Sequence, residues 1–346
     1  MKHIWLHTVR AYVRLGLYFY YKRIRVVRQA PIPKQAPIIF LSNHQNALVD
    51  ALLIATTSTR FTYFLTRASV FKHPIVAKLL SSVQMLPVFR VRDGWQTIKN
   101  NHNTFDHCVA LLGQNKTVSL FPEGNHNIKR TVRPLSKGFT RIVLDTLKAH
   151  PTLELKLVPV GLNYREGTRF PDAVTLMYGK AIEVRELLKT ETNDQKASML
   201  LKQNVQEALK TLTTHIAPEH YETHLEHLHE QQADFFYPEH LNASLASGGV
   251  TYTGPTYKRS FGMLRGVFKR LLIFNLWLPF LVWRYKVLPK IKEVEFIATF
   301  RFALAITLVP LWLLLVACIV GAVFGWAFGA WYLGASLALA LVYVKM

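Results

Sequence analysis

From Ala36 to about residue 190, short apolar runs alternate with longer segments in which apolar residues recur at helical spacing. Short apolar runs between crossover-length helical segments are typical of a parallel sheet that is buried on both faces. The pattern therefore predicts an α/β domain with a mostly parallel sheet flanked by helices. The predicted strands are 37–42, 61–66, 84–90, 117–122, 155–163 and 173–179, and the predicted helices are 46–56, 72–82, 95–114, 136–148 and 181–188.

The pattern changes at the C-terminus, where residues 302–344 form a run of 43 residues without a charge. At about 1.5 Å per residue, one helix of that length would be roughly twice the ~30 Å hydrocarbon thickness of a bilayer. Gly321, Gly325 and Gly329 lie near the midpoint of the run, where a turn is needed. The run predicts a transmembrane hairpin with helices at about 302–323 and 326–344, its two ends on the same side of the membrane. The three glycines also have the four-residue spacing of closely packed helices.

Other segments complete a predicted division of the chain. Residues 4–20 mix aromatic and aliphatic residues with Arg10 and Arg14, which suits a helix lying in the headgroup interface, although a core helix of the soluble domain has the same pattern. The apolar run 271–283 is too short to span and predicts an interfacial or re-entrant segment. The predicted units are 1–30 (interfacial helix), 31–190 (α/β domain), 191–240 (polar helical extension), 241–260 (linker), 261–292 (basic interfacial segment) and 293–346 (transmembrane hairpin).

Charge supports a membrane rather than a nucleic-acid partner. The formal net charge is +21, with fourteen Lys and Arg against one acid before residue 93, and nine against none between residues 240 and 292. Basic segments of this kind adhere to anionic surfaces. The hairpin, and the lack of any zinc, helix-turn-helix or stacking motif, argue against nucleic acid. Basic residues flank the hairpin, which predicts an integral membrane protein with its catalytic body on the cytoplasmic face.

Metal chemistry has little support in the sequence. Cys108 and Cys318 are the only cysteines, and they give neither a disulfide framework nor a metal cluster. His220 and His224 have the spacing of a metal pair, but they lie in a Glu-rich segment with the character of a solvated surface. We therefore predict no metal site and no bound cofactor.

Candidate catalytic residues stand where the first predicted strand ends. His44 leaves that strand, and Asp50 lies six residues further on, with Asn46 between them. Neutral imidazole accepts a hydroxyl proton near neutral pH, and a carboxylate on its other ring nitrogen fixes the tautomer and stabilises the cation that forms. Such a pair activates an alcohol for direct attack on a thioester. A helix-capping Asn-His pair with Asp50 in a surface turn is the structural alternative.

Three more clusters follow later predicted strands. Arg90 stands at the end of one strand, with Arg92 as a competitor, and an arginine there can make a forked contact with phosphate. In Phe121-Pro122-Glu123-Gly124 the proline fixes a turn, Gly124 lets the backbone approach a ligand, and Glu123 faces the crevice to accept hydroxyls or orient Arg90. Lys137 offers a further cation. The block 158–161 has the character of a strand ending in a turn and is assigned to the acyl path.

The order and spacing of these clusters resemble the glycerol-3-phosphate and 1-acylglycerol-3-phosphate acyltransferase superfamily (PlsC-like). The resemblance runs from about residue 36 to residue 182. It implies an acyl thioester donor, either acyl-CoA or acyl-carrier protein, and direct transfer to the acceptor hydroxyl. It also implies that His44 is the base, Asp50 its partner, and Arg90 and Glu123 contacts of the acceptor's phosphoglycerol group.

One departure from the family pattern concerns the His-Asp spacing. Five residues separate His44 from Asp50, where the family has four. A six-residue offset on one helix rotates by about 240°, so His44 is predicted to lie in the loop before the helix. Asn46 is the alternative partner of His44.

The resulting functional hypothesis is a membrane-bound acyltransferase of phospholipid synthesis that acylates 1-acylglycerol-3-phosphate, a lysophospholipid-like acceptor. Glycerol-3-phosphate or a lyso-aminolipid is the alternative acceptor. A non-catalytic lipid-binding membrane protein that retains the fold is the alternative from another class.

Overall fold

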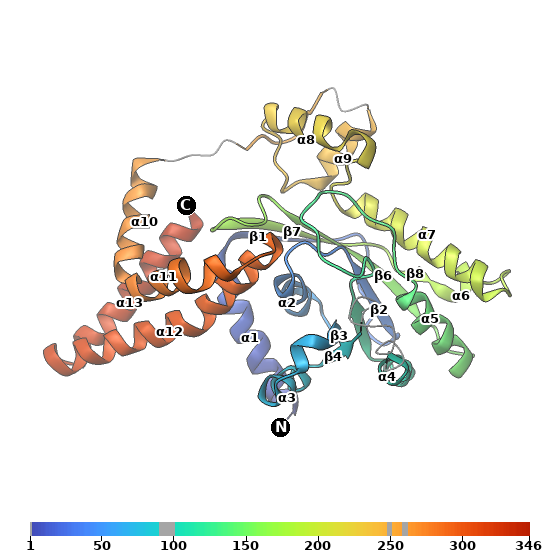
Figure 1. The fold of residues 1–346 in the computed structure, drawn as a ribbon, viewed down its shortest axis with the longest axis horizontal. Helices are drawn as coiled ribbons and strands as arrows, with labels where there is room; N and C mark the ends of the chain where they lie inside the picture. The colour runs from blue at the N-terminus through green and yellow to red at the C-terminus, as the bar shows by residue number, and fades with distance from the viewer. Residues whose placement is uncertain (1, 90–100, 248–250, 258–261) are drawn as a thin grey trace.

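The mostly parallel sheet predicted from the sequence is the centre of the fold. A computed structural model describes residues 2–89, 101–247, 251–257 and 262–346 (Figure 1). Seven strands run in the order β1-β7-β6-β2-β5-β3-β4, and β8 pairs with β6. Neighbours are parallel except for the antiparallel pairs β6–β7 and β6–β8. The strands are β1 (Tyr21–Arg28), β2 (Ile38–Ser42), β3 (Thr62–Arg67), β4 (Met85–Val88), β5 (Thr117–Leu120), β6 (Lys156–Tyr164), β7 (Asp172–Tyr178) and β8 (Ile182–Glu183).

Both faces of this sheet are covered, which explains why its central strands are apolar throughout. Successive residues of a strand point to opposite faces. Ile38 and Phe40 of β2 join one buried cluster, and Ile39 and Leu41 join the other. The first cluster is closed by α1 (Lys2–Tyr20), α2 (Leu48–Thr57) and the start of α12 (Ile297–Phe324), and the second by α4 (Asn101–Gly113), α5 (Gly138–Ala149) and α7 (Asp194–Leu212).

Strand β1 is absent from the sequence-based prediction. Its residues continue the basic character of the N-terminal segment, so 1–30 reads as one interfacial unit. In the structure, helix α1 ends at Tyr20 and the chain enters the sheet at once as β1, parallel to β7. The side chains of Arg25 and Arg28 extend from the strand, and their guanidinium groups lie over the rings of Tyr237 and Tyr178. Charged side chains of this kind are a common feature of edge strands.

Helix α1 has one face in the core and one outside it. Leu6, Val13 and Leu17 are buried, whereas Trp5 and Tyr18 are exposed. The helix therefore has both an apolar inner face, as a core helix has, and an outward aromatic face, as an interfacial helix has.

The polar extension contains several short helices beyond α7. They are η4 (Pro218–His220), α8 (Tyr221–Glu230) and α9 (Pro238–Ala246). Earlier in the chain, α6 (Val184–Leu187) precedes α7, and a turn η1 (Ala68–Phe71) and α3 (Pro74–Ser82) lie between β3 and β4. Helix α9 extends into the segment whose composition predicts a linker. Its Leu241 is fully buried in a small cluster with Phe235 and Tyr252, so these apolar side chains give the segment a core of its own.

The C-terminal run forms the predicted hairpin, which projects to the left in Figure 1. Helices α12 and α13 (Trp326–Lys345) are long and apolar enough to cross a membrane. Gly325 makes the turn with a φ of 103°, a conformation that favours glycine. A Cβ on Gly329 would lie 2.5 Å from the carbonyl oxygen of Ala317, so the glycine lets the two helices pack closely within one chain.

The basic segment before the hairpin is bent. Helix α10 (Met263–Asn275) is followed by α11 (Trp277–Leu281), η5 (Val282–Val287) and η6 (Leu288–Lys290), and η7 (Val294–Phe296) leads into α12. The two parts of this segment meet at 95°, the geometry of a broken span or a re-entrant loop. Met263 and Phe274 of α10 are strongly exposed.

Candidate active site

The candidate residues lie at the edge of the sheet where parallel strands β2, β5 and β6 end. Strand β2 ends two residues before His44, β5 ends three residues before Glu123, and β6 ends at Tyr164. Strand β2 pairs with both of the others in parallel, so their carboxyl ends lie side by side. Open α/β sheets place their ligand crevice at this edge.

His44 and Asp50 form a direct contact there. The Nδ1 atom of His44 lies 2.8 Å from Oδ2 of Asp50, whose side chain is completely buried. Burying a carboxylate is costly unless it is hydrogen-bonded. The backbone N–H groups of Gln45 and Asn46 donate to the same oxygen at 2.7 and 2.8 Å, and the Tyr164 hydroxyl donates to Oδ1 at 2.5 Å. Asp50 is thus the partner of His44, and Asn46 contributes its backbone to the carboxylate.

The orientation of the imidazole follows from these contacts. A carboxylate accepts hydrogen bonds, so the neutral ring carries its proton on Nδ1 and leaves Nε2 as the basic nitrogen. The ring also stacks on Phe121, with 3.8 Å between centroids and 9° between planes. Two independent contacts therefore fix the ring, and the pair has the geometry of a general base with an orienting carboxylate.

The loop between the two residues contains a strained turn. Helix α2 begins at Leu48, so His44 lies in the loop before the helix, as the six-residue offset predicts. Ala47 has a φ of 45° and a ψ of −123°, and Val49 N–H donates to the Asn46 carbonyl across it. These values are those of the first central residue of a type II′ turn, a position that favours glycine. The extra residue of the His-Asp block is accommodated in this turn.

The strain at Ala47 gives a first prediction. An L-residue held in such a region costs about 1–3 kcal/mol. Glycine at position 47 removes that strain. It also makes the unfolded chain more flexible, which lowers the free energy of unfolding by about 0.4–1 kcal/mol. We expect Ala47→Gly to keep wild-type activity with a Tm equal or slightly higher. Ala47→Val, with a β-branched side chain, should lower both Tm and kcat. Equal Tm and kcat for the valine variant would show that the turn is not strained.

Known acyltransferases are similar to the part of the chain that carries this pair. Residues 23–163 match the Acyltransferase family model. The chain is 29% identical over 117 residues to glycerol-3-phosphate O-acyltransferase 1 of Saccharomyces cerevisiae, which covers 32% of this chain and 15% of the relative. It is 24% identical over 138 residues to 1-acyl-sn-glycerol-3-phosphate acyltransferase of Borreliella burgdorferi, covering 40% of this chain and 53% of the relative. The chain contains an acyltransferase domain of the PlsC-like kind.

A solved structure is also similar. The 1-acyl-sn-glycerophosphate acyltransferase PlsC of Thermotoga maritima aligns with a TM-score of 0.43 and 17% identity, over 61% of this chain and 81% of that one. The chain spans about half the length of the bacterial relative and a much smaller share of the yeast one. The matched region contains most of β1 and β6 together with all of β2 and α2, and so includes both His44 and Asp50.

Glu123 of the acyltransferase domain is held by an arginine that the sequence does not single out. Its carboxylate is 3% exposed and pairs with Arg133 at 2.6 Å. Arg133 also donates to the side chain and the backbone carbonyl of Asn125, at 2.5 and 2.6 Å. Burial raises the pKa of Glu123, and the adjacent Arg133 opposes that shift. Arg133 thus fixes the loop that follows β5. The predicted partner Arg90, and its competitor Arg92, lie outside the described residues.

A large cavity opens beside His44. Its volume is about 1230 Å³, and its lining includes Glu123, Gly124 and Lys137 together with apolar side chains of the helices around it. Gly124 has a φ of 81°, and no atom beyond its own residue and its two chain neighbours lies within 4 Å of the place a Cβ would take, so the cavity comes up to its backbone. Four of the predicted site residues therefore share one cavity: His44, Glu123, Gly124 and Lys137.

The block 158–161 is not the strand end that the sequence predicts. It lies within β6 rather than at a strand end, and Pro159 pairs with Leu41 of β2. A Cβ on Gly161 would lie 2.1 Å from the carbonyl oxygen of Leu212, so this glycine lets the end of α7 pack on the strand. The block is absent from the lining of the large cavity. Its apolar character reflects burial in the sheet.

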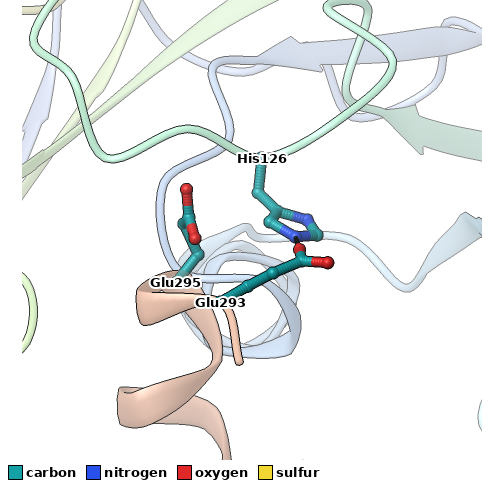
Figure 2. Close-up of side chains that lie close together, drawn as sticks. All are labelled: His126, Glu293 and Glu295. Carbon is teal, nitrogen blue, oxygen red and sulfur yellow. Dashed lines mark hydrogen bonds and ion pairs between the residues drawn. The ribbon is translucent and has the colours of Figure 1, made fainter. Parts of the chain in front are cut away.

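His126, three residues after Glu123, brings a second segment to the site (Figure 2). Its ring stands edge-on to that of His44 with 5.6 Å between centroids, and its Nε2 atom lies 2.7 Å from Oε2 of Glu293. The ligand atoms of His126, Glu293 and Glu295 lie within 4.8 Å of one another. Imidazole and carboxylates suit a divalent transition metal. The hydrogen bond between His126 and Glu293 already accounts for two of the three side chains without a metal.

Proposed function

We propose that the protein transfers a fatty acyl group from an acyl thioester, either acyl-CoA or acyl-carrier protein, to the free hydroxyl of 1-acylglycerol-3-phosphate. The observation that supports this most directly is the 2.8 Å contact between His44 and buried Asp50 at the edge of a largely apolar cavity. The apolar lining suits a fatty acyl chain.

The reaction needs no protein nucleophile. Nε2 of His44 takes the proton of the acceptor hydroxyl as its oxygen attacks the thioester carbonyl carbon. Asp50 stabilises the imidazolium that forms. The tetrahedral intermediate collapses, the C–S bond breaks, the ester C–O bond remains, and the leaving thiolate takes the proton from His44. The products are a diacylglycerol phosphate and a free thiol.

The acceptor's phosphate requires cations near the base. We assign this role to Lys137 at the cavity and to Arg90, and we assign to Glu123 and Gly124 the contacts with the glycerol part. Glycerol-3-phosphate is the second candidate acceptor, since the chain is also similar to a yeast glycerol-3-phosphate O-acyltransferase. A lyso-aminolipid carboxylate would suit the same cations.

We assign the reaction to a membrane surface, and the apolar hairpin supports this assignment. Both ends of the hairpin lie against the acyltransferase domain: Arg301 donates to the Thr168 carbonyl, and Lys345 donates to the carbonyls of Tyr18 and Tyr21. We infer that the domain lies on the cytoplasmic face, because basic residues flank the hairpin. The basic and apolar side chains of α10 suit contact with anionic lipids.

The proposed function is tested with purified protein in detergent. Labelled acyl-CoA and acyl-carrier protein are each offered with 1-acylglycerol-3-phosphate, glycerol-3-phosphate and a lyso-aminolipid, beside a His44→Ala blank. We expect the highest kcat/KM for 1-acylglycerol-3-phosphate. Faster transfer to another acceptor would reassign the substrate, and no transfer to any of them would favour a non-catalytic lipid-binding role.

A further inference from the structure

The start of helix α12 touches the turn that connects His44 to Asp50. The Thr299 hydroxyl donates to the carbonyl oxygen of Asn46 at 2.9 Å and accepts from the N–H of Val49 at 3.4 Å. These two backbone groups stand on either side of Ala47, the residue with a φ of 45°. One side chain from the membrane hairpin therefore bridges the strained turn.

The position of Thr299 is itself well determined. Ala298 and Phe302 on either side of it are 1% exposed and belong to the core cluster of the domain. Fully burying a phenylalanine contributes about 1.5–3 kcal/mol. The Tyr20 hydroxyl donates to the Ala298 carbonyl at 3.3 Å, and Arg301 donates to the Thr168 carbonyl at 2.8 Å. The first turns of α12 are therefore part of the acyltransferase domain rather than a tether to the bilayer.

The same turns also form part of the cavity wall. Phe296, Thr299 and Phe300 line the cavity together with His44. His126, whose ring stands against His44, contacts Glu293 just before α12 and Phe296 within η7, with 4.6 Å between the two rings. The hairpin thus approaches the base from two sides, through the turn before α2 and through the loop after β5.

We propose that Thr299 is a positioning residue, which holds the turn from His44 to Asp50 so that Nε2 of His44 meets the acceptor hydroxyl. The proposal rests on the proposed function. A turn strained at Ala47 persists only when its surroundings hold it. The hydroxyl of Thr299 bonds to a backbone group on each side of Ala47, donating to the Asn46 carbonyl and accepting from the Val49 N–H. A displacement of about 1 Å in a catalytic group can lower a rate by roughly 10²-fold.

Kinetics of Thr299 variants test the inference. Thr299→Val keeps the shape of the side chain and removes the hydroxyl, and we expect it to lower kcat by about 10- to 100-fold with little change in the KM for either substrate. Thr299→Ser keeps the hydroxyl and should retain most of kcat. Thr299→Ala, which adds no bulk, is measured alongside in case valine disturbs the fold. Thr307→Val is the matched control, because its hydroxyl bonds to Ala303 within the exposed part of α12.

A second measurement does not depend on acyl transfer. The rate at which diethyl pyrocarbonate modifies His44, followed by peptide mass spectrometry, reports the environment of the ring. We expect Thr299→Val to change this rate several-fold and Thr307→Val to leave it unchanged. If the wild type transfers no acyl group, the proposed function fails, and this rate still decides the role of Thr299.

Three results would overturn the inference. An unchanged kcat together with an unchanged modification rate in Thr299→Val would remove the positioning role. A serine variant as impaired as the valine variant would show that packing, and not the hydroxyl, matters. A raised KM with an unaltered kcat would show that Thr299 only lines the cavity and contributes to substrate binding.

Discussion

Replacement of His44 by alanine is expected to lower kcat for acyl transfer by about 10²–10⁴, the range found when a general base is removed. Without the imidazole, the acceptor hydroxyl keeps its proton and attacks the thioester poorly. The fold should survive, because Asp50 retains the two backbone N–H groups and the Tyr164 hydroxyl as donors. The measurement is kcat with the best acceptor of the panel, beside Tm in the same detergent.

The control for this variant is another histidine. His220 is exposed and stands beside His224 with 5.5 Å between ring centroids, far along the chain from the acyltransferase domain. His220→Ala should retain wild-type kcat and Tm. A His44→Ala protein that is folded and retains kcat within about tenfold of the wild type would remove His44 from the role of base, even if the acceptor assignment were right.

The sheet could be predicted because its strands are short apolar runs separated by helical patterns. Strand β1 could not, since its lysine and arginines resemble an interfacial extension of α1. Its alternation of Arg23 and Arg25 with Ile24 and Val26 is the signal that would have identified it. The hairpin could be predicted because 43 uncharged residues have few other structures available.

The site could be predicted only in part. His44 and Asp50 are close in sequence, and the offset between them already places His44 in the loop before α2. Tyr164 and Thr299 complete the same turn from 114 and 253 residues away, and no local pattern marks them. Packing of β6 and α12 onto the sheet brings them there. His126 could have been predicted from the sequence, since a histidine three residues after Glu123 must lie near the same strand end.

Replacement of Arg133 by methionine is expected to be the most destabilising single change at the site. Removing one partner of a buried ion pair costs roughly 3–5 kcal/mol, because the other charge stays buried and unpaired. Arg133 is 23% exposed, so the lower end of that range, about 3 kcal/mol, applies. The loop after β5 also loses the bonds from Arg133 to Asn125, so kcat should fall together with Tm. Lys210→Met, at the exposed pair with Glu207, should cost no more than about 1 kcal/mol.

The pH dependence of this loss identifies its cause. Burial already raises the pKa of Glu123 in the folded protein, and removing Arg133 removes the effect that opposes the rise. A carboxyl whose folded pKa lies above its unfolded value contributes stability below the unfolded pKa, about 4.3, and loses that contribution as the pH rises through the folded pKa. The Tm deficit of Arg133→Met should therefore be small near pH 4.5 and larger at pH 7.5. Adding Glu123→Gln should remove most of the pH dependence, because no carboxylate is then left without its partner. A deficit independent of pH would instead point to the lost contacts with Asn125.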